Sequence, residues 1–148
     1  AGLSGTGKST VATALAEATG YALVSSDALR KRHGDATPTA VPCDEAMYTA
    51  EARAAVYRAL CDEATRILCS GRGVIADATF VRRDDRARLA GVVTERGCRH
   101  VFIECRAPED VVRARLDARR YAVSESDARW ETYLGQCRER EPFGPDGR

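Results

Sequence analysis

The segment that most constrains the fold of this chain is residues 2–9, which read Gly-Leu-Ser-Gly-Thr-Gly-Lys-Ser. They match the phosphate-binding pattern G-x-x-x-x-G-K-[ST] at every position. Glycines let the backbone turn tightly, so that successive N–H groups face inward and form a concave anion site. The Ala-rich segment 9–18 predicts a helix whose free N–H groups and positive dipole end lie beneath the phosphates. The segment therefore predicts binding of a nucleotide polyphosphate.

Two polar residues of this loop have expected roles in binding the nucleotide. Lys8 is expected to reach the β- and γ-phosphates, and the Ser9 hydroxyl to coordinate Mg²⁺. A glycine-rich turn that only caps a helix is the alternative, but loop, lysine, hydroxyl and helix all agree with the first reading. The predicted nucleotide-binding residues are Gly2, Ser4, Gly5, Thr6, Gly7, Lys8, Ser9 and Thr10.

A phosphate-binding loop of this kind should follow a buried apolar strand, yet only Ala1 precedes Gly2. We therefore expect residues 1–148 to be a piece of one domain from which the first strand is missing.

Length and charge narrow the classes of function. The 148 residues amount to one domain, and 44% hydrophobic and 30% charged residues are typical of a soluble globular protein. A net charge of +1 argues against a broad nucleic-acid or membrane surface. No apolar run approaches the roughly 20 residues of a membrane span, and no signal peptide is visible, so we expect a cytoplasmic location without membrane contact.

Short apolar runs alternate with helical periodicity along the rest of the chain. The expected strands are 21–25, 74–77 and 100–105, and the expected helices are 28–32, 49–70, 82–96, 108–119 and 126–138. Ser26 and Asp27 are expected to cap the first of these helices. The alternation predicts an α/β fold of three layers, with a parallel sheet between helices and ligands at the carboxyl ends of the strands.

Two charged residues follow the first of these strands. Asp27 lies two residues beyond it and could accept the proton of an attacking hydroxyl. Its alternative role is helix capping, and both roles could hold. Arg30 would share a helix face with Asp27 and could bind an anionic or polyhydroxy acceptor, although an exposed, solvated arginine is nearly as good an interpretation.

A second acid ends the strand 74–77. Asp77 is expected to hold Mg²⁺ or its water shell beside Ser9, and Thr79 could add a hydrogen bond. The alternative for Asp77 is again helix capping.

Four arginines crowd the end of the helix 108–119: Arg113, Arg115, Arg119 and Arg120. Arg115 and Arg119 are four residues apart and project from one face. Such a cluster before a polar break predicts a lid in which an arginine neutralises charge on the transferred phosphoryl group. The alternative is a cationic helix end that complements the helix dipole.

Two further features have structural interpretations. Trp130 and Tyr133 are three residues apart on the last expected helix and are interpreted as packing residues. The mixed-charge run 82–88 is interpreted as a solvated helix face.

The motifs described above, in the order in which they occur along the chain, resemble those of the small P-loop kinases of the zeta-toxin and polynucleotide-kinase-like group of AAA-type ATP-binding domains. The resemblance covers nearly the whole chain. The loop is shared by many NTPases, whereas Asp-x-x-Arg after the strand and Arg-x-x-x-Arg in the lid are much narrower signals. The matching segments are GLSGTGKST, SSDALRKR, YTAEARAAVY, GVIADATF, VFIECRAP, RARLDARR and SESDARW.

The resemblance implies a role for each charged residue outside the loop. Asp27 matches the general base of the family and Arg30 its acceptor-binding arginine. Arg119 matches the transition-state arginine, assisted by Arg115. The loop residues keep the phosphate and magnesium roles given above.

The resemblance also implies an architecture. Relatives order their sheet 2-3-1-4-5, so this chain would lack the central first strand and, because no apolar strand follows Arg148, the last strand as well. Similar domains are fused behind an aminoglycoside-phosphotransferase-like domain.

The expected activity is transfer of the γ-phosphoryl of ATP, with Mg²⁺, to a hydroxyl group. The acceptor could be a polyol or sugar, a nucleotide sugar, or a polynucleotide 5′-hydroxyl, and the near-neutral charge favours a small molecule. The alternatives are a non-catalytic ATP-binding module that regulates a fused domain, and an ATPase that uses water. Asp27 and Arg30 separate the first reading from the others, since a switch module needs neither.

Overall fold

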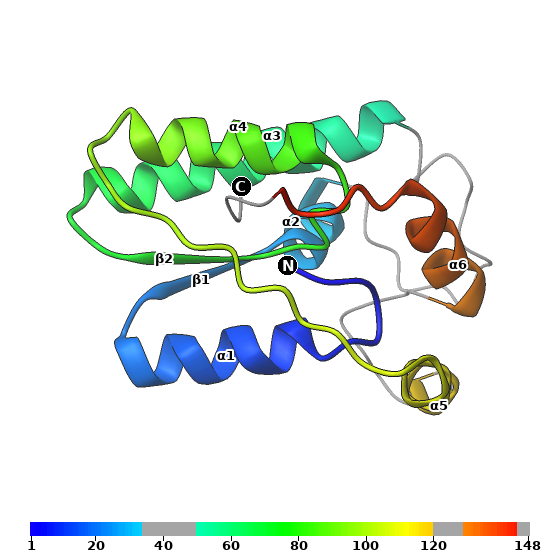
Figure 1. The fold of residues 1–148 in the computed structure, drawn as a ribbon. Coiled ribbons are helices and arrows are strands. Elements are labelled where there is room, and N and C mark those ends of the chain that lie inside the picture. The colour runs from blue at the N-terminus through cyan, green and yellow to red at the C-terminus, as the bar shows by residue number, and fades with distance from the viewer. Residues whose placement is uncertain (34–49, 120–128, 145–148) are drawn as a thin grey trace.

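The computed structural model describes residues 1–33, 50–119 and 129–144 (Figure 1). The elements of these residues are α1 (Lys8–Thr19), β1 (Ala22–Ser25), α2 (Ser26–His33), α3 (Ala50–Cys69), β2 (Val74–Asp77), α4 (Arg83–Thr94), α5 (Glu109–Arg119) and α6 (Trp130–Glu139). Among these described residues, no helix has the length and apolar character needed to cross a bilayer.

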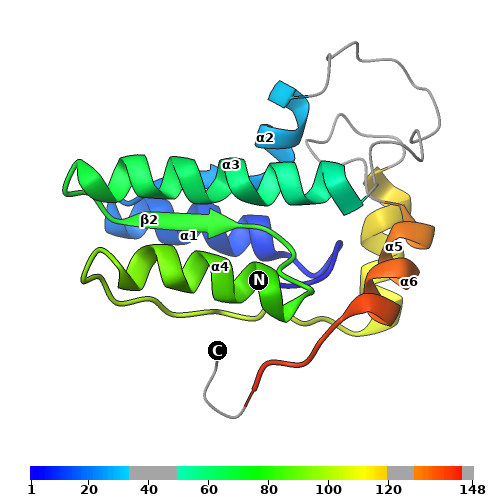
Figure 2. The same cartoon turned by 90° about the horizontal axis from the view of Figure 1, so that it is seen from above.

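β1 and β2 are parallel neighbours in a two-stranded sheet, in a register that runs from Ala22 beside Val74 to Ser25 beside Asp77. α1 covers one face of this sheet, and α3 and α4 cover the other (Figures 1 and 2). The three-layer α/β/α arrangement with a parallel sheet is confirmed. Because both strands end at the same edge, the residues that follow Ser25 and Asp77 lie close to one another.

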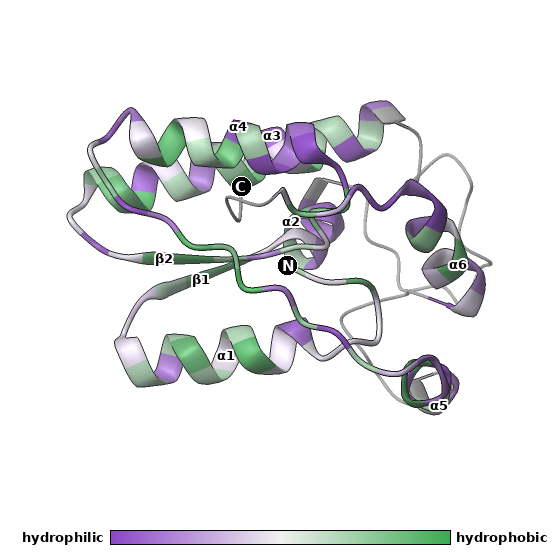
Figure 3. Cartoon of the chain, viewed as in Figure 1, coloured by the Kyte–Doolittle hydropathy of each residue, from purple (hydrophilic) through white to green (hydrophobic). Residues whose placement is uncertain are grey.

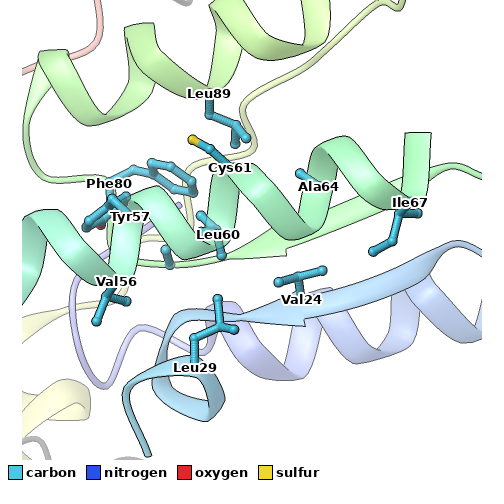
Figure 4. Packing of buried hydrophobic residues seen from close by; sticks show 11 residues of the cluster. Val24, Leu29, Val56, Tyr57, Leu60, Cys61, Ala64, Ile67, Phe80 and Leu89 are labelled. Carbon is cyan, nitrogen blue, oxygen red and sulfur yellow. The ribbon is translucent and has the colours of Figure 1, made fainter. Parts of the chain in front are cut away.

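The main core lies between the sheet and α3. Val56, Leu60, Ala64 and Ile67 recur at intervals of four, four and three residues, so they share one face of α3 and turn toward the strands (Figure 4). Figure 3 shows apolar residues along the faces of the helices that meet the sheet, with polar residues outside. Burial of each large side chain contributes about 1.5–3 kcal/mol, which fixes α3 over the strands.

The strand predicted for 100–105 is wrong. Residues 98–108 form neither helix nor strand, and cross the molecule as an extended segment (Figure 1). A strand needs a continuous ladder of backbone hydrogen bonds to a neighbour. Here a cavity of about 830 Å³ separates this segment from β2. Because of this separation, β2 is too far away to be the hydrogen-bonding partner that such a ladder would need.

This cavity, the inter-strand cavity, has four walls. β2 forms one wall and residues 98–103 the opposite one, while α1 and α4 contribute Leu15 and Leu89 to the remaining two. Its lining is mostly apolar, as the interior of a three-layer fold requires.

Ala1 and Gly2 together bridge the two sides at one end of the inter-strand cavity. The amino group of Ala1 donates to the Ile103 carbonyl at 2.8 Å, and the Ala1 carbonyl accepts the Cys105 N–H at 2.9 Å, as in a parallel ladder. On the other side, the N–H of Gly2 donates to the Thr79 carbonyl at 3.2 Å. Ala1 therefore lies between β2 and residues 101–105, where the expected order 2-3-1-4 places the end of a first strand.

α5 and α6 form a smaller cluster beside the main body. Val112, Leu116 and Tyr133 are buried there, with Leu3 and Trp130 packed against them. The rings of Trp130 and Tyr133 stack at 5.1 Å, which confirms their interpretation as packing residues. Of the helix predicted for 126–138, residues 126–128 lie outside the described residues.

Two local predictions are corrected. The run 82–88 is not uniformly solvated, because Arg86 is only 1% exposed. Helix α2 begins at Ser26, so Asp27 lies in its first turn and is not the cap; the Ser25 hydroxyl oxygen accepts the N–H of Ala28 at 3.4 Å instead.

Candidate functional site

The glycine loop ends on the N-terminus of α1. Gly7 is the N-cap, with φ 93° and ψ 11°, a left-handed conformation that glycine adopts without strain. It offers no side-chain cap, and the Val11 N–H makes the first bond back to the Gly7 carbonyl at 3.1 Å. The N–H groups of Lys8, Ser9 and Thr10 come before that bond, so the first turn of the helix presents them to an anion.

Other loop residues are held by the protein itself. The N–H and hydroxyl of Thr6 both donate to the Leu3 carbonyl, at 3.3 and 2.8 Å, which closes the turn. Ser4 is 3% exposed, its N–H donates to Gln136 Oε1 at 2.8 Å, and its hydroxyl oxygen accepts from Gln136 Nε2 at 3.0 Å. In this arrangement Ser4 and Thr6 shape the loop, while the concave side belongs to residues 7–10.

Asp77 lies at the carboxyl end of β2 and is 6% exposed. Its Oδ1 is buried and has no hydrogen-bond partner. A buried carboxylate oxygen without a partner carries a large desolvation cost, which a cation would offset. Lys8 and Asp77 both line the inter-strand cavity.

The residues present fit a magnesium ion. Mg²⁺ takes hard oxygen ligands, usually one or two from the protein with the rest from phosphate and water. The unpartnered Oδ1 of Asp77 and the exposed hydroxyl of Ser9 in the first turn of α1 supply that chemistry.

Asp27 and Arg30 lie together in α2, immediately beyond β1. Arg30 Nη1 donates to Asp27 Oδ1 at 2.9 Å, and the two side chains are 31% and 18% exposed. The prediction that they share a helix face is confirmed. Since Ser25 pairs with Asp77 in the sheet, the carboxylates of Asp27 and Asp77 follow adjacent strand ends.

The predicted lid arginines divide into three groups. Arg115 Nη1 donates to the Gly5 carbonyl at 3.3 Å and lies 3.5 Å from the position a Cβ would take on Gly7, so it reaches the phosphate loop. Arg113 turns instead to the Trp130 ring, 5.1 Å from its centroid. Arg119 is the last residue of α5, and its side chain, like all of Arg120, lies outside the described residues.

A buried hydroxyl that sequence reasoning missed holds the turn after β2. The Tyr57 hydroxyl accepts the N–H of Phe80 at 2.9 Å and lies 3.2 Å from Thr79 Oγ1. Burial raises the pKa of Tyr57, which keeps the phenol protonated. The Tyr57 hydroxyl thus contacts the side chain of Thr79, and the backbone carbonyl of Thr79 accepts the N–H of Gly2.

Arg86 braces the same turn from α4. Its Nη1 donates to the carbonyls of Phe80 and Val81, at 2.8 and 3.3 Å, and its guanidinium lies 4.4 Å from the centroid of the Phe143 ring. Phe80 has φ 50°, the only left-handed conformation of a non-glycine residue in the described part of the chain. The strained turn between β2 and α4, which contacts the phosphate loop through the Gly2–Thr79 hydrogen bond, is therefore fixed by Tyr57 and Arg86 together.

The fold and this site define a class of protein. A glycine loop leading into a helix, a buried acid on a neighbouring parallel strand and helices on both sheet faces are the features of a P-loop nucleotide-binding domain. The chain belongs to the family described as "AAA domain", whose sequence model matches residues 1–142.

Curated relatives share this sequence over part of their length. An uncharacterised protein of Mycobacterium tuberculosis strain H37Rv is 35% identical over 127 residues, which cover 84% of this chain and 25% of that protein. The chain therefore spans about a quarter of the length of the curated relatives it matches.

Solved structures share the fold. A sugar kinase from Janibacter sp. HTCC2649, in unliganded form, aligns with a TM-score of 0.70 and 24% identity over 98% of this chain and 77% of that one. Kti12 from Chaetomium thermophilum, in complex with ADP-AlF3, aligns with a TM-score of 0.73 and 20% identity over 99% of this chain and 81% of that one. The chain thus has the fold of small P-loop kinases.

Proposed function

We propose that this domain is an ATP- and Mg²⁺-dependent phosphotransferase that moves the γ-phosphoryl group of ATP to a hydroxyl acceptor. The observation that carries the proposal is the convergence at one sheet edge of the free N-terminus of α1, the unpartnered Asp77 carboxylate, and Asp27 with its arginine. The first two bind a nucleotide with its metal, and the third supplies what a hydroxyl acceptor needs. The fold it shares with the sugar kinase supports the proposal.

The phosphate loop and the start of α1 bind the phosphates. The N–H groups of residues 8–10 and the ammonium of Lys8 bind the β- and γ-phosphate oxygens and stabilise the charge that develops on them. Arg115, already in contact with the Gly5 carbonyl, and Arg119 at the end of α5 neutralise the transferred group. Ser9 and Asp77 would hold Mg²⁺, which when bound neutralises phosphate charge and orients the polyphosphate.

The residues of α2 bind and activate the acceptor. Asp27 accepts the proton of the acceptor hydroxyl while the acceptor oxygen bonds to the γ-phosphorus and the bond from that phosphorus to the bridging oxygen of ADP breaks, so that ADP leaves. Arg30 orients the carboxylate in the free protein through its 2.9 Å ion pair, and in this proposal it is the residue that binds the acceptor.

The acceptor that we favour is a small polyol, sugar or nucleotide sugar, because a net charge of +1 provides little attraction for a polynucleotide. A cytoplasmic reaction and a fused aminoglycoside-phosphotransferase-like neighbour remain part of this proposal. The alternative is an ATP-binding module that regulates such a neighbour or hydrolyses ATP. The Asp27–Arg30 pair favours transfer, since neither alternative needs it.

The test is a transfer screen with γ-labelled ATP against separate pools of sugars and polyols, nucleotide sugars, nucleosides, and 5′-hydroxyl oligonucleotides. We expect label to move to one small-molecule pool, and the Lys8→Ala variant to abolish the transfer through loss of polyphosphate binding. Nucleotide binding without label in any pool, together with release of inorganic phosphate, would favour the hydrolytic alternative.

A further inference from the structure

The outer side of the phosphate loop is held by a residue with no expected role in phosphate binding. Gln136 lies on α6, 132 positions from Ser4 in the sequence, yet both atoms of its side-chain amide bond to Ser4. Oε1 accepts the loop N–H at 2.8 Å, and Nε2 donates to the hydroxyl oxygen at 3.0 Å. Only a group with an acceptor and a donor side by side can make this pair of bonds, and the backbone N–H fixes which end of the amide faces it.

A second contact joins the same stretch of loop to α5. A Cβ on Gly5 would lie 2.9 Å from Val112 Cγ1, so α5 packs directly on the glycine backbone. The Gly5 carbonyl also accepts from Arg115 at 3.3 Å. Residues 4 and 5 are thus bound by both helices of the smaller cluster.

The smaller cluster is distinct from the main core. Its buried residues Val112, Leu116 and Tyr133 pack with Leu3 of the loop, whereas the main core gathers between the sheet and α3. Figure 2 shows α5 and α6 side by side at one end of the molecule, next to the loop that begins at the N-terminus. The pair therefore meets the body of the protein at the phosphate loop, while the end of α6 is also tied to α3 by the Arg53–Glu139 ion pair at 2.8 Å and to residues 98–108 by the Arg140–Glu104 ion pair at 2.6 Å.

We propose that Gln136 is a positioning residue that couples α6 to the phosphate loop, so that nucleotide binding on the inner side of the loop orders α5 and α6 on its outer side. Ser4 is 3% exposed, and a shift of the loop either carries Gln136 along or leaves a buried N–H unpaired. Binding and helix position are therefore linked, and the link is reciprocal. The inference rests on nucleotide binding by the loop and not on phosphoryl transfer.

The test is hydrogen exchange of α6 amides with and without ADP, together with the ADP dissociation constant. Gln136→Met keeps the length of the side chain and removes both hydrogen bonds. We expect ADP to slow exchange across α6 in the wild type and not in this variant, and ADP binding to weaken about tenfold. Arg138→Ala, on an exposed position of the same helix, is the matched control and keeps the wild-type response.

A double-mutant cycle shows whether the effect passes through Ser4. Ser4→Ala removes the hydroxyl and one of the two bonds, and we expect it to weaken ADP binding about threefold. The double variant should be no weaker than Gln136→Met alone, because both changes remove the same contact. Additive losses, or an ADP response of α6 that survives in Gln136→Met, would overturn the coupling. If circular dichroism shows that the methionine variant is unfolded, Gln136→Asn, which is too short to reach Ser4, replaces it with the same two criteria.

Discussion

At the scale of single residues, the two acids of the site differ in how their charge is compensated. Asp27 is paired with Arg30 at 2.9 Å and partly exposed, whereas Asp77 is buried with an oxygen that has no partner. A base must be reachable by the acceptor, and a metal ligand must present an oxygen that no protein donor occupies. These environments support the proposal in which Asp27 accepts the proton and Asp77 binds magnesium.

The first prediction concerns Asp27→Asn. An amide keeps the size of the side chain and a contact to Arg30 but cannot accept the proton. We expect phosphoryl transfer to fall by at least about 10²-fold and ATP affinity to stay within a few-fold. Steady-state kinetics and calorimetric titration of the full-length protein measure both. Asp62→Asn, an exposed carboxylate on α3, is the control, and unchanged turnover in Asp27→Asn would remove the base assignment.

The sequence locates the phosphate-loop residues but carries no signal for the residues that support them. Lys8 and Ser9 are identified by spacing within nine residues, and Asp27 and Asp77 by their place after an apolar run. Tyr57 and Gln136 carry no such signal, because their partners lie 22 and 132 positions away and each looks like an ordinary helix residue. Arg86 was misread for a related reason: its neighbours in the sequence are charged and exposed, and only the fold buries it.

At the scale of elements, the turn between β2 and α4 is held by hydrogen bonds from two directions. Arg86 donates to the carbonyls of Phe80 and Val81 on one side and to that of Pro142 on the other, at 3.1 Å. The turn, α4 and the segment after α6 are thereby joined through one buried guanidinium.

The second prediction follows from this junction. Arg86→Ala leaves buried carbonyls unpaired and should lower the free energy of unfolding by about 3 kcal/mol. Arg86→Lys should recover less than half of the loss, because a single ammonium cannot span both sets of carbonyls. Urea unfolding measures the difference. A lysine variant as stable as the wild type would show that charge alone, and not the fork of the guanidinium, holds the turn.

Glu104 joins the extended segment 98–108 to the end of α6. Its carboxylate accepts from Arg106 and Arg140, each at 2.6 Å. Burial alone would raise the pKa of Glu104, but the hydrogen bonds and charges of the two arginines outweigh it and lower the pKa below its ordinary 4.5. A lowered pKa means that the folded state favours the charged form.

The third prediction is the pH dependence of this contact. Its stabilisation is fully present above pH 4.5 and is lost as the pH falls through the lowered pKa of the folded state. Glu104→Gln should therefore cost about 1 kcal/mol at pH 7, after screening by solvent, and progressively less below pH 4.5. Urea unfolding across this pH range measures it. An equal loss at pH 7 and pH 3 would indicate a packing effect instead.

At the scale of the whole molecule, the inter-strand cavity explains why 98–108 is not a strand. The sequence predicts strand geometry there from its apolar run, but a strand forms only against a partner, and β2 lies across the cavity. We propose that a parallel strand leading into Ala1 fills this space, with alternate side chains toward α1 and α4. Val101, at 83% exposed, and Ile103, at 49%, flank the cavity as open apolar edge residues.

The fourth prediction tests this filling. Extending the chain before Ala1 by about five alternating valine and isoleucine residues should raise the free energy of unfolding by at least about 2 kcal/mol, because burial of apolar side chains exceeds the cost of ordering them. A glycine and serine extension of the same length should have no effect. Hydrogen exchange should also show new protection at 101–105, and equal stability of the two extensions would contradict the proposal.

Ala1 is one peptide bond from Gly2, which opens the phosphate loop; Ala1 bonds to Ile103 and Cys105 on one side, and Gly2 bonds to Thr79 on the other. A displacement of Ala1 therefore reaches the phosphate loop through a single residue. A strand that fills the inter-strand cavity and a nucleotide that binds the phosphate loop should therefore each raise the affinity for the other.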